Sequence, residues 1–137
     1  YKKALIDHGI PFNPELVVHG DYKMSSGKLG MGELLKLPYQ FTAVACANDL
    51  MAVGALDTLH EKGIEVPKEI SITGYDDIYL AGMTYPKLTT MAQAKYSLGV
   101  QAMKLLVELM DGKSTGAEEI VLRPRLVVRD SVERRRI

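Results

Sequence analysis

The amino-acid sequence predicts an α/β fold in which a parallel sheet carries helices on both of its faces. Three short apolar segments alternate along the chain with segments of helical periodicity. This alternation is typical of parallel strands that are connected by helices. The chain has 137 residues, of which 47% are hydrophobic and 25% are charged, and this is the size and composition of one soluble globular domain.

The first and third predicted strands follow the same kind of helix ending. One helix stops at Gly9 and is followed by a strand over residues 16–18, and another stops at Gly63 and is followed by a strand over residues 70–73. Glycine readily adopts the left-handed conformation that ends a helix. A proline follows each glycine and prevents the helix from continuing. The order of helix and then strand is therefore predicted twice.

Between these two units the sequence predicts one more helix and strand. The helix covers about residues 25–37, where Ser25 or Ser26 can cap it and leucines recur at helical spacing. The strand covers residues 42–47 and leads into the helix that ends at Gly63. The opening residues, YKKALIDHGI, begin inside a helical pattern with no cap before it, so we expect a piece of a longer protein.

The last part of the chain has a different pattern. The segment PKLTTM is extended, and residues 95–111 form an amphipathic helix that Gly112 ends. The final run, EEIVLRPRLVVRDS, is extended again, and Pro124 divides it into two short pieces that cross between layers.

Polar side chains gather where each predicted strand ends. In open parallel sheets, ligands bind beyond the carboxyl ends of the strands. An aromatic ring, an amide and carboxylates at that edge suit a polyhydroxylated ligand such as a sugar, because they stack on its ring or accept hydrogen bonds from its hydroxyls. The residues at the three strand ends are Asp21 and Tyr22, Asn48 and Asp49, and Asp76 and Asp77.

Each of these residues also has a structural interpretation. Tyr22 would then be a half-exposed loop aromatic, Asn48 would form an Asx turn, and Asp49 would be the N-cap of the next helix. Neighbouring side chains diverge, so one of Asp76 and Asp77 faces the site while the other binds the loop. The convergence of the strand ends favours Tyr22, Asn48 and Asp76 as ligand-binding residues.

The sequence contains no catalytic, metal-binding or cofactor-binding pattern. The stretch SSGKLGMG departs from a phosphate-binding loop at two positions, with Tyr22 in place of the first glycine and Leu29 in place of Ser or Thr. The three histidines lack metal-ligand spacing, and the single cysteine, Cys46, lies in an apolar strand. We therefore expect no enzymatic activity, no catalytic residue, no metal and no cofactor.

The charges indicate no general attraction to nucleic acid or to a membrane. Lysine and arginine together number 17, as do aspartate and glutamate, so the net charge is zero. All arginines lie within residues 123–136, and we interpret them as a solvated strand edge and tail. The alternative is an arm that grips phosphates, but no aromatic residue is interleaved with the arginines to stack on bases.

Six stretches of the chain together resemble the bacterial lactose/galactose-repressor (LacI/GalR) family of transcriptional regulators. They cover almost the whole chain in the order and approximate spacing of that family. The stretches are GDYKMSSG, ANDLMAVGAL, VPKEISITGYDD, PKLTTM, SLGVQAMKLL and RPRLVVRDS. The resemblance implies the C-terminal part of the effector-binding core, with a fold shared with periplasmic sugar-binding proteins. It also implies that Tyr22, Asn48 and Asp76 contact the effector.

The same resemblance implies a division of the chain. Residues 1–90 would form the C-terminal effector-binding subdomain, and residues 91–118 a crossover and a helix that packs on an absent N-terminal subdomain. Residues 119–137 would form a return strand and a basic tail. Without the absent subdomain, the apolar face of the helix, including Leu98 and Leu109 with Leu105 between them, would be exposed.

The resemblance further implies a cytoplasmic homodimer that responds to a small molecule. Its effector would be a sugar, a phosphosugar or a nucleobase, and operator DNA would be bound only through a headpiece that lies outside these residues. The alternative is a periplasmic-type sugar-binding protein of a transporter. That alternative predicts the same fold, but with a signal peptide and as a monomer.

A candidate dimer surface is centred on the helix that contains LMAVGALDTL, which is apolar nearly all round. Such a helix has no solvent face, so one side packs on the sheet and the other is covered by a second subunit or by a loop of the same chain. In the first case the stretch IYLAGMTY flanks the helix. The residues predicted at this interface are Met51, Val53, Leu56, Tyr79, Met83 and Tyr85.

Overall fold

The computed structural model describes residues 1–113, 116–117 and 119–134. The other positions of the predicted segments 91–118 and 119–137 lie outside the described residues. The elements in chain order are helix α1 (Lys2–Asp7), the 3-10 turn η1 (Pro14–Leu16), α2 (Met24–Leu34), β1 (Ala43–Ala45), α3 (Asp49–Glu61), β2 (Ser71–Thr73), the 3-10 turn η2 (Tyr79–Gly82), β3 (Thr90–Ala92), α4 (Lys95–Met110) and β4 (Arg125–Val127). None of the helices found in the described residues is long and apolar enough to span a membrane.

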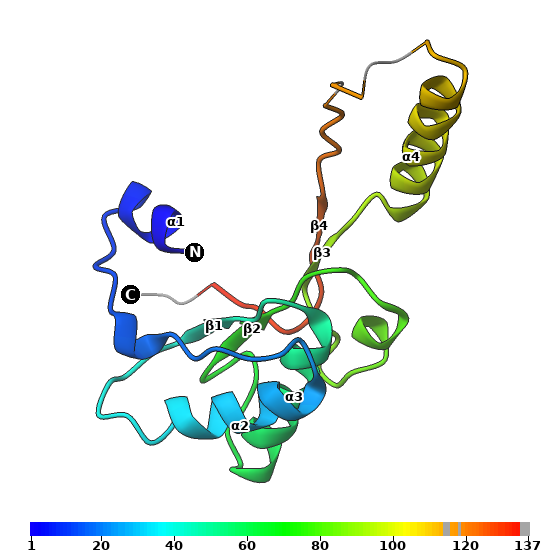
Figure 1. Cartoon of the computed structure of the whole chain (residues 1–137). Helices are drawn as coiled ribbons and strands as arrows, with labels where there is room; N and C mark the ends of the chain where they lie inside the picture. The colour runs from blue at the N-terminus through cyan, green and yellow to red at the C-terminus, as the bar shows by residue number, and fades with distance from the viewer. Residues whose placement is uncertain (114–115, 118, 135–137) are drawn as a thin grey trace.

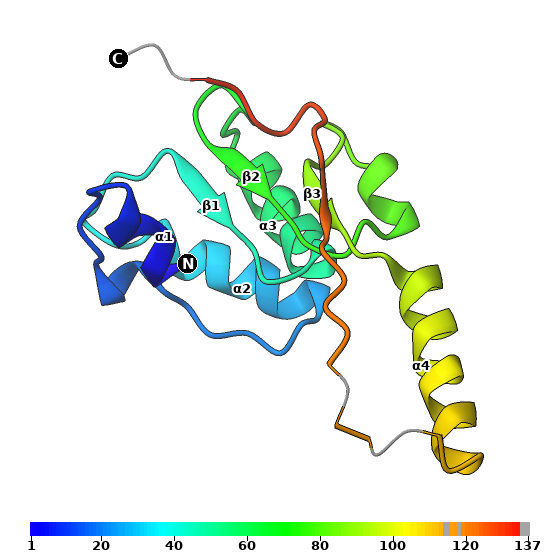
Figure 2. The same cartoon turned by 90° about the horizontal axis from the view of Figure 1, so that it is seen from above.

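The predicted α/β class with a parallel sheet is confirmed. Strands β1 and β2 are parallel, with Val44 opposite Ile72. A parallel bridge between Thr73 and Thr89 brings the chain just before β3 to the other side of β2, so β1, β2 and β3 lie side by side (Figure 2). The strands predicted over residues 42–47 and 70–73 are present, although each is shorter than predicted.

The strand predicted over residues 16–18 does not form. Pro14 instead begins the 3-10 turn η1, and the side chain of Asn13 caps this turn by accepting a hydrogen bond from the Glu15 amide. The amide of Val17 donates to the Pro14 carbonyl and closes the turn. Because these local bonds use the backbone groups that would start a strand, the edge of β1 that faces this segment has no paired strand.

The hydrophobic core lies between the sheet and helices α2 and α3 (Figure 1). The two helices approach each other closely because each has a glycine at the crossing. A Cβ atom on Gly27 would lie 2.0 Å from the Met51 carbonyl oxygen, and one on Gly54 would lie 2.0 Å from the Met24 carbonyl oxygen. The buried apolar residues are Met31, Ala52, Ala55, Leu56, Leu59, Ile70, Ile72, Ala81 and Leu88.

The C-terminal segment is attached to the sheet through a buried serine. The hydroxyl of Ser131 donates to the Ile72 carbonyl at 2.6 Å and accepts from the Thr89 amide at 2.8 Å. The Ile72 amide in turn donates to the Ser131 carbonyl at 2.8 Å. Ser131 is therefore bonded to both β2 and the residue before β3, and this explains the position of the stretch VVRDS in the fold.

Helix α4 forms where the amphipathic pattern predicts it, and none of its residues is buried. It extends away from the body of the molecule, beyond the antiparallel β3–β4 ribbon that lies at its base (Figure 1). Leu98 is 54% exposed and Leu109 is 44% exposed. The apolar face of this helix is thus uncovered in the chain by itself.

The two crossing glycines give a prediction about stability. We expect Gly54→Ala to lower the free energy of unfolding by about 2–3 kcal/mol or more, because the added methyl group meets the backbone of α2. The matched control is Gly32→Ala on α2, where a Cβ would meet nothing within 4 Å. This control should be stabilising by about 0.5–1 kcal/mol, because alanine loses less conformational entropy in a helix. Urea denaturation measures both values, and similar values for the two variants would contradict the close-packing argument.

Candidate functional site

The three predicted ligand-binding residues lie along one edge of the molecule. The side-chain amide of Asn48 donates to the Tyr22 carbonyl at 2.9 Å, which joins the ends of the segments before α2 and α3. The Asp49 amide donates to the Tyr75 carbonyl at 2.9 Å, which places the start of α3 beside the residue that precedes Asp76. We call the edge formed by Tyr22, Asn48 and Asp76 the strand-end site.

The backbone is strained at this edge. Tyr22, Asp76 and Asp77 have φ angles of 65°, 113° and 51°, and they are the non-glycine residues with positive φ in the described part of the chain. Such conformations cost of order 1–3 kcal/mol each and persist only where the surroundings fix them. Strain of this kind is concentrated at functional sites, and it was not predictable from the residue types, because tyrosine and aspartate usually have negative φ.

Asn48, rather than Asp49, is the N-cap of α3. Its side-chain oxygen accepts from the Met51 amide at 2.9 Å, while its amide group holds Tyr22. The capping role that the sequence suggested for Asp49 is therefore wrong. Asp49 is instead fully buried one position further along. Both residue types are good N-caps, so the sequence alone does not separate them.

The two adjacent aspartates point to different partners, as their spacing predicted. Asp77 pairs with Arg129 at 2.7 Å, where both side chains are mostly buried, rather than with loop backbone. Asp76 accepts a hydrogen bond from the side-chain amide of Gln93 in the crossover to α4. Of the two carboxylates, Asp76 is the one at the strand-end site, and Asp77 anchors the loop.

Asp21 faces its own turn instead of the strand-end site. Its backbone amide donates to the Ser26 hydroxyl, and its carboxylate accepts from the Lys23 amide. Hydrogen bonding to Ser26, followed by that to Lys23, lowers the pKa of Asp21 to about 2. Its carboxylate therefore stays ionised and shapes the turn that carries Tyr22.

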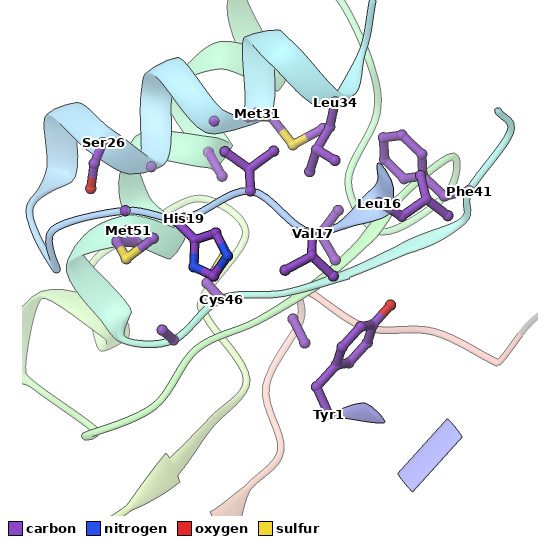
Figure 3. A pocket seen from close by; sticks show the side chains of 18 of the residues that line it. Tyr1, Leu16, Val17, His19, Ser26, Met31, Leu34, Phe41, Cys46 and Met51 are labelled. Atoms are coloured by element: carbon purple, nitrogen blue, oxygen red, sulfur yellow. The ribbon is translucent and has the colours of Figure 1, made fainter. Parts of the chain in front are cut away.

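A hollow of about 460 Å³ lies beside β1, on the edge that has no paired strand. Its walls come from the extended segment with Val17 and His19, from α2 with Met31, and from the region of β1 with Phe41 and Cys46 (Figure 3). Tyr22 also lines it, whereas Asn48 and Asp76 do not. The hollow is mostly apolar, so it lacks the acceptor groups that gather at the strand-end site.

The lysines near this edge are engaged with carboxylates. Lys28 contacts Asp57 and Glu61 on α3, each at 2.7 Å, and hydrogen bonds first to Asp57 and then to Glu61 raise its pKa to about 12. Lys23 pairs with Asp21 at 3.1 Å. Within the described residues, no group of three or more His, Cys, Asp or Glu side chains could hold a metal ion.

The residues predicted at the dimer surface fall into two sets. Leu56 is buried in the core and is not accessible to a second subunit, while Met51 and Val53 on the same helix are half-buried. Helix α2 packs closely against α3 on the same face of the sheet (Figure 1). The other three residues, on and after η2, are free at the surface. They are Tyr79, Met83 and Tyr85, which are 85%, 62% and 101% exposed.

Comparison with known proteins first gives the class of domain. Residues 1–132 match the family described as the periplasmic binding protein-like domain. This class combines an α/β fold with a binding site, in agreement with the parallel sheet and the polar strand ends described above.

Within that class, the chain belongs to the LacI family of bacterial transcriptional regulators and corresponds to part of their effector-binding core. It is 39% identical over 131 residues to the transcriptional repressor CytR of Escherichia coli, covering 96% of this chain and 38% of CytR. It is 37% identical to the transcriptional regulator RegA of Clostridium saccharobutylicum, covering 96% of this chain and 40% of RegA. The chain thus spans about two fifths of the length of these relatives.

Solved structures agree with this assignment. The repressor AscG of Escherichia coli matches with a TM-score of 0.86 and 34% identity, covering 96% of this chain and 48% of that structure. The complex of the regulator CelR with cellobiose matches with a TM-score of 0.92 and 35% identity, covering 96% of this chain and 40% of that structure. These relatives are transcriptional regulators and not enzymes. They favour the repressor interpretation over the alternative of a transporter-associated binding protein.

The burial of Cys46 gives a prediction about thiol reactivity. Burial, reinforced by the negative charge of Asp49, raises the pKa of the Cys46 thiol to about 12. Since the thiolate is the reactive form, we expect iodoacetamide at pH 8 to label Cys46 about a hundredfold or more slowly in the folded protein than in urea. Mass spectrometry follows the labelling, with glutathione as a control for the effect of urea on the reagent. Equal labelling rates in the two states would show that the Cys46 thiol is accessible and that its pKa is not raised.

Proposed function

We propose that the chain is the effector-sensing core of a cytoplasmic bacterial repressor, and that it binds a small polar molecule at the strand-end site. The observation that carries this proposal is the placement of the strained residues Tyr22 and Asp76 on one edge, with Asn48 bonded between α3 and Tyr22. Strain that the surroundings maintain on a surface edge indicates a binding role more than a packing role. Relatives that are repressors support the assignment to transcription control.

A sugar or sugar derivative is the ligand that this edge suits best. The Tyr22 side chain is 65% exposed and can stack on the apolar face of a sugar ring. The Asp76 carboxylate can accept from a ligand hydroxyl beside its bond to Gln93. Asn48 supports the site by holding Tyr22. One structural relative is a cellobiose complex and another contains phosphate, and we keep phosphosugars and nucleobases as the other candidate effectors.

The remaining surfaces of the chain fit a larger protein that changes shape. The uncovered face of α4, with Leu98 and Leu109 among its exposed apolar residues, would pack on a second subdomain that completes the effector cleft. Operator DNA would be bound by a headpiece outside these residues. An effector changes operator affinity only if it binds one arrangement of the subdomains more tightly than the other.

Dimerisation is proposed through the exposed residues around η2. Tyr79, Met83 and Tyr85 combine large apolar surface with strong exposure, which is unusual for a surface that stays in water. The aromatic residues and methionine are also enriched at protein interfaces. The half-buried Val53 on α3 would lie at the margin of this contact.

The effector proposal is tested by ligand-induced stabilisation of the full-length protein. Cellobiose, glucose 6-phosphate and adenosine represent the three candidate classes, and a ligand at a hundredfold excess over Kd should stabilise the protein by about 2.7 kcal/mol. We expect Asp76→Ala to weaken binding of the active compound about 10- to 100-fold, because a charge-assisted hydrogen bond is lost. The control is Asp57→Ala, an exposed carboxylate on α3 away from the site. Stabilisation that survives Asp76→Ala would remove Asp76 from the site.

The dimer proposal is tested by placing a charge on its most exposed residue. We expect Tyr85→Glu to weaken the dimer at least about tenfold in sedimentation equilibrium, since a carboxylate would be desolvated in an apolar contact. The control is Tyr96→Glu on α4, where the side chain is 87% exposed and outside the proposed surface. A dimer that is unchanged by Tyr85→Glu but lost on Tyr96→Glu would transfer the contact to α4.

A further inference from the structure

Asp49 is a carboxylate that is completely shielded from solvent at the start of α3. A buried carboxylate is costly unless several donors satisfy it. None of the ion pairs found within the described residues includes Asp49, so it is satisfied by uncharged donors alone. Asn48 already caps the helix, so helix capping does not explain why a carboxylate is buried at the next position.

The bonds of Asp49 connect three parts of the chain that are far apart in sequence. One carboxylate oxygen accepts from the Thr90 hydroxyl of β3 at 2.5 Å. The other accepts from the Ile78 amide, beyond the two aspartates, at 2.8 Å. The backbone amide of Asp49 donates to the Tyr75 carbonyl, on the near side of the aspartates, at 2.9 Å. Asp49 therefore binds the loop on both sides of Asp76.

The approach of Asp49 to the loop depends on a glycine. A Cβ atom at Gly74 would lie 2.2 Å from one carboxylate oxygen of Asp49, so any other residue there would displace the carboxylate. The Gly74 amide donates to the Thr89 carbonyl at 3.0 Å, and the Asp76 amide donates to the Met91 carbonyl at 2.9 Å. The loop is thus held between Asp49 on one side and the β3 region on the other.

We propose that Asp49 is a positioning residue of the strand-end site, which fixes the loop of residues 74–78 so that Asp76 presents its carboxylate to the ligand. The proposal rests on the function proposed above. Asp76 and Asp77 are held in left-handed backbone conformations between the two loop residues that Asp49 binds. Loss of the carboxylate leaves the Ile78 amide without its acceptor, and the loop can then relax the strained residues and move Asp76.

The first test needs no ligand and uses amide hydrogen exchange measured by NMR. The variant is Asp49→Asn, which has the same shape but presents an amide group to one of the two donors. We expect the Ile78 and Asp76 amides to exchange at least tenfold faster, while the Met51 amide, which Asn48 caps, is unchanged. Faster exchange at Met51 together with unchanged exchange at Ile78 would mean that Asp49 only supports the helix, and would overturn the proposal. Asp57→Asn on the same helix is the control and should alter none of these amides.

The second test asks whether Asp49 acts on binding through Asp76. The probe is whichever of cellobiose, glucose 6-phosphate and adenosine stabilises the protein. We expect Asp49→Asn to weaken binding of that probe at least tenfold in the wild-type background and less than twofold in the Asp76→Ala background. Equal losses in both backgrounds would overturn the positioning role. If no probe binds, the proposed effector function fails, while the exchange test still decides whether Asp49 holds the loop.

A second variant covers the case in which Asp49→Asn does not fold. Thr90→Val removes the hydroxyl donor from β3 and leaves the carboxylate in place. We expect it to accelerate exchange at Ile78 and Asp76 at least threefold, because Asp49 is then held by one fewer donor. Unchanged exchange at both amides in Thr90→Val would overturn the proposal.

Discussion

The arrangement of the strand-end site depends on the first residues of helix α3. Asn48 and Asp49 are adjacent, yet their side chains bind opposite parts of the chain. Asn48 binds the carbonyl of Tyr22, and Asp49 binds the loop that carries Asp76. One helix start therefore fixes the turn that carries Tyr22 and the loop that follows β2 relative to itself. The carboxyl ends of parallel strands meet at one edge by topology, but these short bonds set the distances between them.

Helix α3 can serve as this reference because two neighbours fix its own position. The sheet packs against it through Leu56 and Leu59, and α2 crosses it closely at Gly27 and Gly54. Backbones that approach this closely leave little freedom for the helix to slide, because any shift brings carbonyl groups into contact. The strain at the strand-end site is thus maintained by a rigid body, as strained functional sites require.

Sequence periodicity predicted most of the helices and strands. The features that it did not predict depend on contacts between residues that are far apart in the chain. The strands around Val44 and Ile72 and the amphipathic helix α4 were predictable because their patterns are local. The first predicted strand failed because Asn13 and Pro14 begin a turn, although the apolar run after them is typical of a strand. The role of Asp49 was hidden because its partner Thr90 is 41 positions away in the chain. The close packing of α2 against the apolar helix α3 was equally hidden, because it depends on Gly27 and Gly54, which are 27 positions apart.

Asp76 connects the strand-end site to the segment that leaves the body of the molecule. Its carboxylate accepts from Gln93, and the ammonium group of Lys95, the first residue of α4, donates to the Asp77 carbonyl at 3.2 Å. Under the proposed function, a ligand hydroxyl that bonds to Asp76 must share the carboxylate with Gln93 or displace it. Ligand binding under that proposal would therefore act directly on the segment that leads into α4. Its effect on the position of α4 is limited by the difference in affinity between the arrangements with and without the Gln93 bond.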